Sequence, residues 1–121
     1  MHKLLFTLFL ASAICLAADD SSAYWQHLQQ HPSAEVQKQV ERYRQGLCSV
    51  DEILVAEEQQ LLRQMQTADK QQYVQLGQQL IRNYREQLRM EELRGAQNNV
   101  KIPRIRQKLH ELEARVLQAG L

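Results

Sequence analysis

Two histidines stand four residues apart near the start of the chain, His27 and His31. On a helix this spacing places two nitrogen ligands on one face, as many zinc sites require. A metal site also needs a third or fourth ligand, and no Cys or carboxylate follows these histidines at ligand spacing. Pro32 moreover puts His31 at a helix end. We therefore expect His27, His31 and His110 to be surface histidines, and we expect no bound metal.

The acidic residues include two adjacent pairs, Glu57-Glu58 and Glu91-Glu92. Neighbouring residues point to different parts of a helix surface, whereas general acid–base catalysis needs two carboxylates that converge in a pocket. The chain also has no Ser-His-Asp order, no Gly-rich phosphate loop and no Cys-x-x-Cys motif. The sequence thus predicts a protein that is not an enzyme and uses no cofactor or small-molecule substrate.

The N-terminus has the pattern of a secretory signal peptide. A short basic start is followed by an apolar run from Leu4 to Leu16, and Ala17-Ala18 then precedes polar residues. The apolar run is shorter than the roughly 20 residues of a membrane span, although an uncleaved anchor is the alternative. We expect residues 1–18 to be removed together with Cys15, and residues 19–121 to form one periplasmic or secreted domain.

Cys48 is the one cysteine that remains after such a cleavage. An unpaired cysteine in an exported protein suggests either an intermolecular disulfide or a free thiol. A small, half-buried apolar residue at a turn is an equally good interpretation. Both stay open on the sequence.

The overall composition favours helices. The chain has 15 Lys plus Arg against 14 Asp plus Glu, so it lacks the basic excess of a nucleic-acid-binding protein. It has only 4 Gly and 2 Pro, which argues against a turn-rich β fold. We predict an all-α fold, either an elongated helical hairpin or a small helical bundle with coiled-coil character.

Local signals divide the mature chain into four helices. Ser33 and Ser49 are expected N-caps, Glu52 completes a capping box with Ser49, and Gly46 ends a helix in the left-handed conformation. Thr67-Ala68-Asp69 could break the chain, with Thr67 as the cap of a new helix. Because no Gly or Pro lies there, we expect instead one helix of 45 residues, about 68 Å long, continuous or mildly kinked. The predicted helices are residues 23–30, 34–45, 50–94 and 103–119.

The last helix carries a heptad pattern, in which apolar residues recur at alternating spacings of three and four. Such a seam must be buried against another helix. Its partner is either a helix of the same chain or a second copy in a homodimer, and the sequence leaves both open. The seam residues are Ile102, Ile105, Leu109, Leu112 and Val116.

Residues 34–84 resemble the periplasmic hairpin tip of TolC-like outer-membrane efflux factors. The resemblance is carried by an aromatic residue, a glycine three residues on, a hydroxyl residue and an aliphatic pair. In that family the tip docks against a periplasmic adaptor protein, so the resemblance implies a docking surface. This chain lacks barrel strands and a duplicated hairpin, so it does not form a channel. The implied partner-binding residues are Tyr43, Gly46, Leu47, Ser49, Ile53 and Leu54.

The expected function is therefore non-enzymatic protein binding in the periplasm, as an accessory to an envelope assembly such as an efflux system. Two alternatives are open. One is a small periplasmic chaperone or stress protein that shields unfolded clients, and the other is an immunity or inhibitor protein that binds a toxic enzyme. In each case the partner is a protein and not a nucleic acid.

Overall fold

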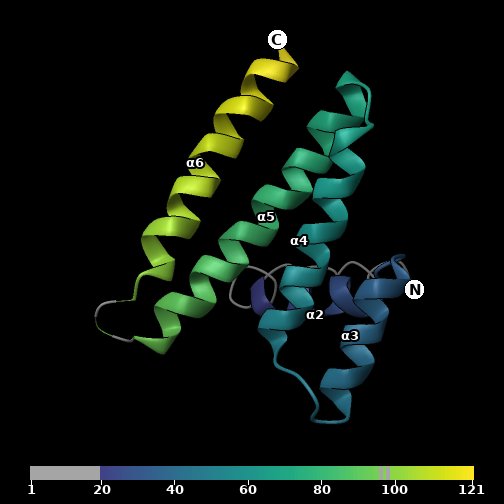
Figure 1. The fold of residues 1–121 in the computed structure, drawn as a ribbon, viewed down its shortest axis with the longest axis vertical. Coiled ribbons are helices and arrows are strands. Elements are labelled where there is room, and N and C mark those ends of the chain that lie inside the picture. The colour runs from purple at the N-terminus through teal and green to yellow at the C-terminus, as the bar shows by residue number, and fades with distance from the viewer. Residues whose placement is uncertain (1–19, 96, 98) are drawn as a thin grey trace, which may run out of the picture.

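The computed structural model describes residues 20–95, 97 and 99–121, and the expected signal peptide with Cys15 lies outside them. Within the described residues there are helices and no strand, which confirms the all-α prediction. None of these helices is long and apolar enough to cross a membrane. The helices are α2 Asp20–Gln29, α3 Ala34–Arg44, α4 Val50–Gln66, α5 Lys70–Arg94 and α6 Lys101–Gly120 (Figure 1).

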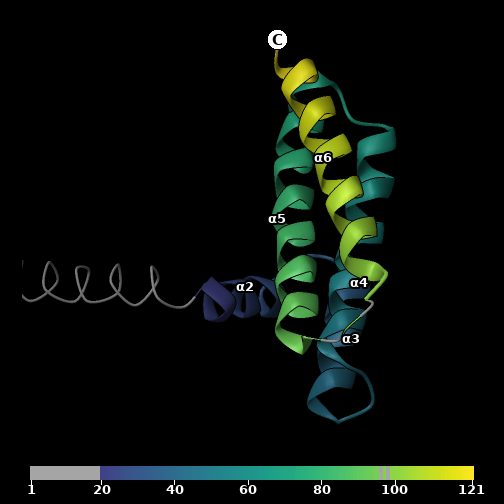
Figure 2. The same cartoon turned by 90° about the vertical axis from the view of Figure 1, so that its left-hand side faces the viewer.

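The helices form an up-and-down bundle in which each one packs chiefly against the next in sequence. α4 and α5 make a long antiparallel hairpin, and α6 returns along α5 (Figure 1). α3 and α4 make a shorter hairpin, while α2 lies across the long axis of the bundle (Figure 2). α2 begins at Asp20, which is earlier than the expected residue 23.

The expected single helix over residues 50–94 is wrong, because the chain reverses direction after α4. Asp69 caps α5: its side chain accepts a hydrogen bond from the Gln72 backbone N–H at 2.8 Å. The Gln72 side chain in turn accepts one from the Asp69 N–H at 3.4 Å. This capping box starts a new helix without any Gly or Pro, so the two halves pair with each other instead of extending.

The other local signals act as expected. The Ser33 hydroxyl accepts a hydrogen bond from the Val36 N–H at 3.5 Å at the start of α3. The Glu52 carboxylate accepts one from the Ser49 N–H at 3.1 Å at the start of α4. Gly46 has a φ of 75°, the left-handed conformation that lets the α3–α4 turn form without Cβ strain.

Two clusters of buried apolar side chains hold the helices together. The N-terminal core joins α2, α3 and the first half of α4, through Tyr24, Leu28, Val36, Val40, Ile53 and Leu54. The C-terminal core joins the second half of α4 to α5 and α6, through Leu61, Met65, Leu80, Tyr84, Ile105, Leu109, Leu112 and Val116. α4 therefore belongs to both cores.

The α6 seam is buried within the chain. Four of its five residues lie in the C-terminal core, and Ile102 is half-buried. α5 and α6 approach so closely that a methyl group added at Gly77 would overlap the Val116 side chain. In this structure the seam is therefore buried against helices of the same chain, which is the first of the two alternatives.

Candidate functional site

The predicted docking tip is the turn between α3 and α4. Tyr43 and Leu47 are 39% and 61% exposed, and both can contact a partner. Ser49 is exposed as well, whereas Ile53 and Leu54 are 0% exposed. The prediction that these last two residues form the docking surface is wrong, because the chain uses them to build its own N-terminal core.

An apolar groove lies beside this turn. Its lining is shared by α2, α3, α4 and α5, and includes Trp25, Tyr43 and Val50. The Trp25 and Tyr43 rings meet edge to face, with their centroids 5.1 Å apart. Glu86 and Arg89 line the groove too, and they form an ion pair of 2.5 Å. The lining of the groove thus combines aromatic rings with an ion pair.

Exposed apolar side chains also occur at two turns of the bundle. The α3–α4 and α5–α6 turns lie toward the lower end in both views, on different sides of the molecule in Figure 1 (Figures 1 and 2). Within or next to these turns are four large hydrophobic residues that are 39–72% exposed. We call this surface the apolar end: Tyr43, Leu47, Leu93 and Val100.

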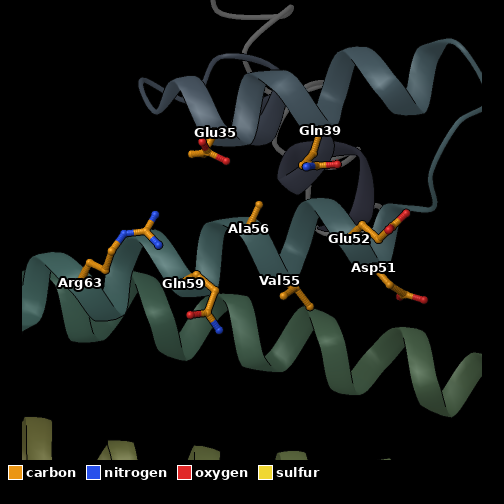
Figure 3. A pocket seen from close by; sticks show the side chains of 8 residues that line it. All are labelled: Glu35, Gln39, Asp51, Glu52, Val55, Ala56, Gln59 and Arg63. Carbon is orange, nitrogen blue, oxygen red and sulfur yellow. The ribbon is translucent and has the colours of Figure 1, made fainter.

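A second hollow, between α3 and α4, has a different chemistry. Figure 3 shows that polar and charged side chains from both helices line it without converging on one point. Two of its three acidic residues also have partners elsewhere, since Asp51 pairs with Arg94 and Glu52 accepts the Ser49 N–H. This hollow therefore offers no assembled group for catalysis.

A buried carboxylate, Glu57, is the centre of the densest polar cluster in the described residues. It is 1% exposed. The Tyr24 hydroxyl and the Asn83 amide both donate to its Oε1, the latter at 2.9 Å. Its Oε2 lies 2.5 Å from the His27 Nε2 and 3.3 Å from the His31 Nε2. A carboxylate has room for about four hydrogen bonds, so Glu57 is fully used.

This cluster corrects the expectation of surface histidines. His31 is 8% exposed, and the His27 side chain is 30% exposed. Their carboxylate partner comes from α4 instead of from the neighbouring sequence. The signal that was missed is the position of Glu57, four residues after Ile53 and four before Leu61 in the buried stripe of α4. A charged residue at such a position must have buried partners.

The tautomer of His31 follows from its two contacts. The Ser33 backbone N–H donates to the His31 Nδ1 at 3.0 Å. An Nδ1 that accepts a hydrogen bond carries no proton, so in the neutral ring the proton is on Nε2. That N–H then points at Glu57.

Burial sets the protonation of the cluster. It lowers the pKa of His31, which therefore favours the neutral form. Burial on its own would raise the pKa of Glu57, but hydrogen bonds from His27, Asn83 and Tyr24 outweigh it and hold that pKa below its usual value. Glu57 is thus ionised at neutral pH, and its ionic partners among the described residues are histidines.

The adjacent Glu58 has a separate set of partners on another part of the α4 surface. The Tyr84 hydroxyl donates to it at 3.1 Å, and the Gln87 amide donates at 3.0 Å. The Lys108 ammonium of α6 lies 3.5 Å away. Burial, together with the Glu58 charge, raises the pKa of Tyr84, which therefore stays protonated. As expected of neighbours, the two glutamates do not converge on one site.

Cys48 is half-buried at the α3–α4 turn and is a free thiol in this structure. Its S–H donates to the Gln39 carbonyl at 3.3 Å. Burial and the nearby Glu52 raise the pKa of the thiol, so its reactive thiolate form is disfavoured. An intermolecular disulfide stays a prediction.

No protein-family model, curated protein or solved structure matches this chain. The resemblance to TolC-like efflux factors thus stays a prediction, and the functional argument rests on the residues themselves.

Proposed function

We propose that this chain is a non-catalytic protein-binding module of the bacterial envelope, and that it docks through the apolar end. The observation that carries the proposal is the exposure of Tyr43, Leu47, Leu93 and Val100 at one end of the bundle. Water contact with apolar surface costs about 25 cal/mol per Å², so a partner that covers these side chains would gain the free energy of their burial.

The apolar end fits the apolar face of a helix in another protein. Tyr43 also lines the apolar groove, together with Trp25 and the Glu86–Arg89 ion pair. An amphipathic helix can place its apolar face against such aromatic rings and pair its polar flanks with the charged side chains. A second copy of the chain is the weaker candidate, because the α6 seam, the other long apolar surface, is already buried within the chain.

The setting in the envelope rests on the signal-peptide pattern of residues 1–18. The resemblance of the α3–α4 turn to an efflux hairpin tip supports an accessory role in an envelope assembly. Such a role predicts one specific partner, whereas a chaperone would bind many clients.

The test is photo-crosslinking in living bacteria that express the full chain. A photoreactive residue replaces Leu47 in one variant and Leu117 in the control, since Leu117 is 72% exposed on α6, away from the apolar end. We expect one discrete adduct from position 47 and none from position 117. The adduct protein, identified and purified, should bind the Leu47→Asp variant at least tenfold more weakly than the Leu117→Asp variant.

Three results would contradict the proposal. Equal adducts at both positions would show that the apolar end has no special role. A ladder of many adducts would favour the chaperone alternative, and an adduct of the chain with itself would replace the protein partner by a second copy.

A further inference from the structure

We infer that His27, His31 and Glu57 form a binding site for one divalent transition-metal ion, with the chemistry of Zn²⁺. This inference is independent of the proposed docking function. It rests on the geometry of three ligand-competent side chains, on the charge of the site and on the contacts that orient its carboxylate.

The geometry suits a tetrahedral ion. One ligand atom from each of the three residues lies within 4.8 Å of the other two. In a tetrahedral zinc site with bonds of about 2.0–2.1 Å, ligand atoms are about 3.3 Å apart. The His31 Nε2 and the Glu57 Oε2 are 3.3 Å apart, and the His27 Nε2 is 2.5 Å from the same oxygen. His27 is partly exposed, so its ring has room to move outward by the remaining distance.

The charge of the site also favours a cation. Glu57 is a buried anion whose ionic partners in the described residues are imidazoles. The other buried carboxylates each have a permanent cation nearby, since Lys108 lies 3.5 Å from Glu58 and Arg94 lies 2.5 Å from Glu91. Glu57 is hydrogen-bonded but has no permanent cation beside it, and a divalent ion would compensate its buried charge.

The surrounding hydrogen bonds prepare Glu57 for this role. Tyr24 and Asn83 both donate to its Oε1, so the carboxylate plane is fixed and Oε2 is the oxygen that faces the histidines. The Asn83 amide is itself held by a hydrogen bond of 2.9 Å to the Leu54 carbonyl. Outer contacts of this kind orient metal ligands and are worth about 10- to 100-fold in affinity.

Metal binding must move one proton, which gives the site a specific signature. In the metal-free protein the His31 Nε2 carries the proton and Nδ1 accepts the Ser33 N–H. A metal ligand needs a free lone pair on Nε2, so that proton leaves to water while Nδ1 takes one up from water. The ring stays neutral, changes tautomer and gives up the Ser33 hydrogen bond.

The first experiment is a calorimetric titration of the untagged full-chain protein, stripped of metal by a chelator, with ZnCl₂. We expect one Zn²⁺ per chain. His27→Gln should weaken binding by about tenfold or more, because it removes a ligand. The matched controls are His110→Gln, an exposed histidine on α6, and Cys48→Ser, and both should bind as the wild type does. Absence of saturable binding, or equal binding by His27→Gln, would overturn the inference.

The second experiment uses the wild-type chain alone, so it decides the matter even if a variant fails to fold. Imidazole ¹⁵N NMR distinguishes the two tautomers of His31. We expect the Nε2–H form without metal and the Nδ1–H form with one equivalent of Zn²⁺. Unchanged His31 nitrogens at saturating Zn²⁺ would overturn the three-ligand site.

Discussion

Glu57 and Glu58 are neighbours in sequence, yet they form two different kinds of buried polar site. Both are nearly inaccessible to water, and each accepts hydrogen bonds from a tyrosine hydroxyl and a side-chain amide. They differ in the basic partner, which is a pair of histidines for Glu57 and Lys108 for Glu58. An ammonium group is a permanent charge at neutral pH, whereas an imidazole gains or loses its charge near neutrality. The nature of the basic partner thus separates a fixed contact from a responsive one.

The two carboxylates also connect different sets of helices. Glu57 connects α2 to α4 and α5, at the edge of the N-terminal core. Glu58 connects α4 to α5 and α6, beside the C-terminal core. The responsive site therefore controls how α2 is attached, and the fixed site supports the three-helix part of the bundle.

The largest expected effect comes from deleting each carboxylate. Glu57→Ala leaves Tyr24 and Asn83, 4% and 0% exposed, without their shared acceptor. It should cost about 2–5 kcal/mol of unfolding free energy, because each buried donor left unpaired costs about 1–3 kcal/mol. Glu58→Ala should cost about 1–2 kcal/mol, because the half-exposed Lys108 can turn to water. Urea unfolding followed by circular dichroism measures both, with the exposed Glu92→Ala as the control. Equal losses of unfolding free energy for Glu57→Ala and Glu58→Ala would contradict the distinction between the two sites.

A smaller effect should appear on mild acidification of the metal-free protein, measured in the presence of a chelator. The folded state holds the pKa of His31 below its ordinary value, so the unfolded chain takes up a proton first as the pH falls. The contribution of His31 to the free energy of unfolding is fully present above the unfolded pKa of about 6.5. It decreases as the pH drops below that value.

The urea concentration at the midpoint of unfolding should accordingly decrease as the pH is lowered from 7.5 to 5.5. His31→Gln should flatten this dependence, while Glu58→Ala should leave it in place. A midpoint that rises on acidification, or a slope that His31→Gln does not change, would contradict this account.

The smallest effect is expected at the lysine of the fixed site. Lys108 is 47% exposed at its side chain and approaches Glu58 at 3.5 Å. Lys108→Met keeps the length of the side chain and removes its charge, and such partly exposed pairs are worth about 1 kcal/mol or less. The same urea unfolding measures the loss. A loss as large as that of Glu57→Ala would show that the fixed site depends on its cation far more than the exposure of Lys108 implies.

The sequence predicted what depends on nearby residues and missed what depends on distant ones. Ser33, Ser49 and Gly46 were identified because caps and left-handed turns act within a few residues. A break at Thr67-Ala68-Asp69 was considered but a continuous helix was preferred, because a capping box without Gly or Pro is a weaker signal.

The candidate sites were harder to predict than the helices. The partners of Glu57 on α2 and α5 are 26 to 33 residues away along the chain, so only tertiary packing brings them together. Ile53 and Leu54 were correctly seen as an apolar stripe but were assigned to a partner. Periodicity shows that a face is buried and does not show which molecule covers it.

The order in which the helices pack has a consequence for how the chain folds. Because each helix packs chiefly against the next, most native contacts are local, and proteins with local contacts fold fast. The contacts of α2 with Glu57 are of another kind, since they pass over α3 and close loops of 30 to 33 residues, which carries an entropic cost. The hairpins of α4, α5 and α6 can thus form early in folding, and the docking of α2 onto Glu57 is the step expected to complete it.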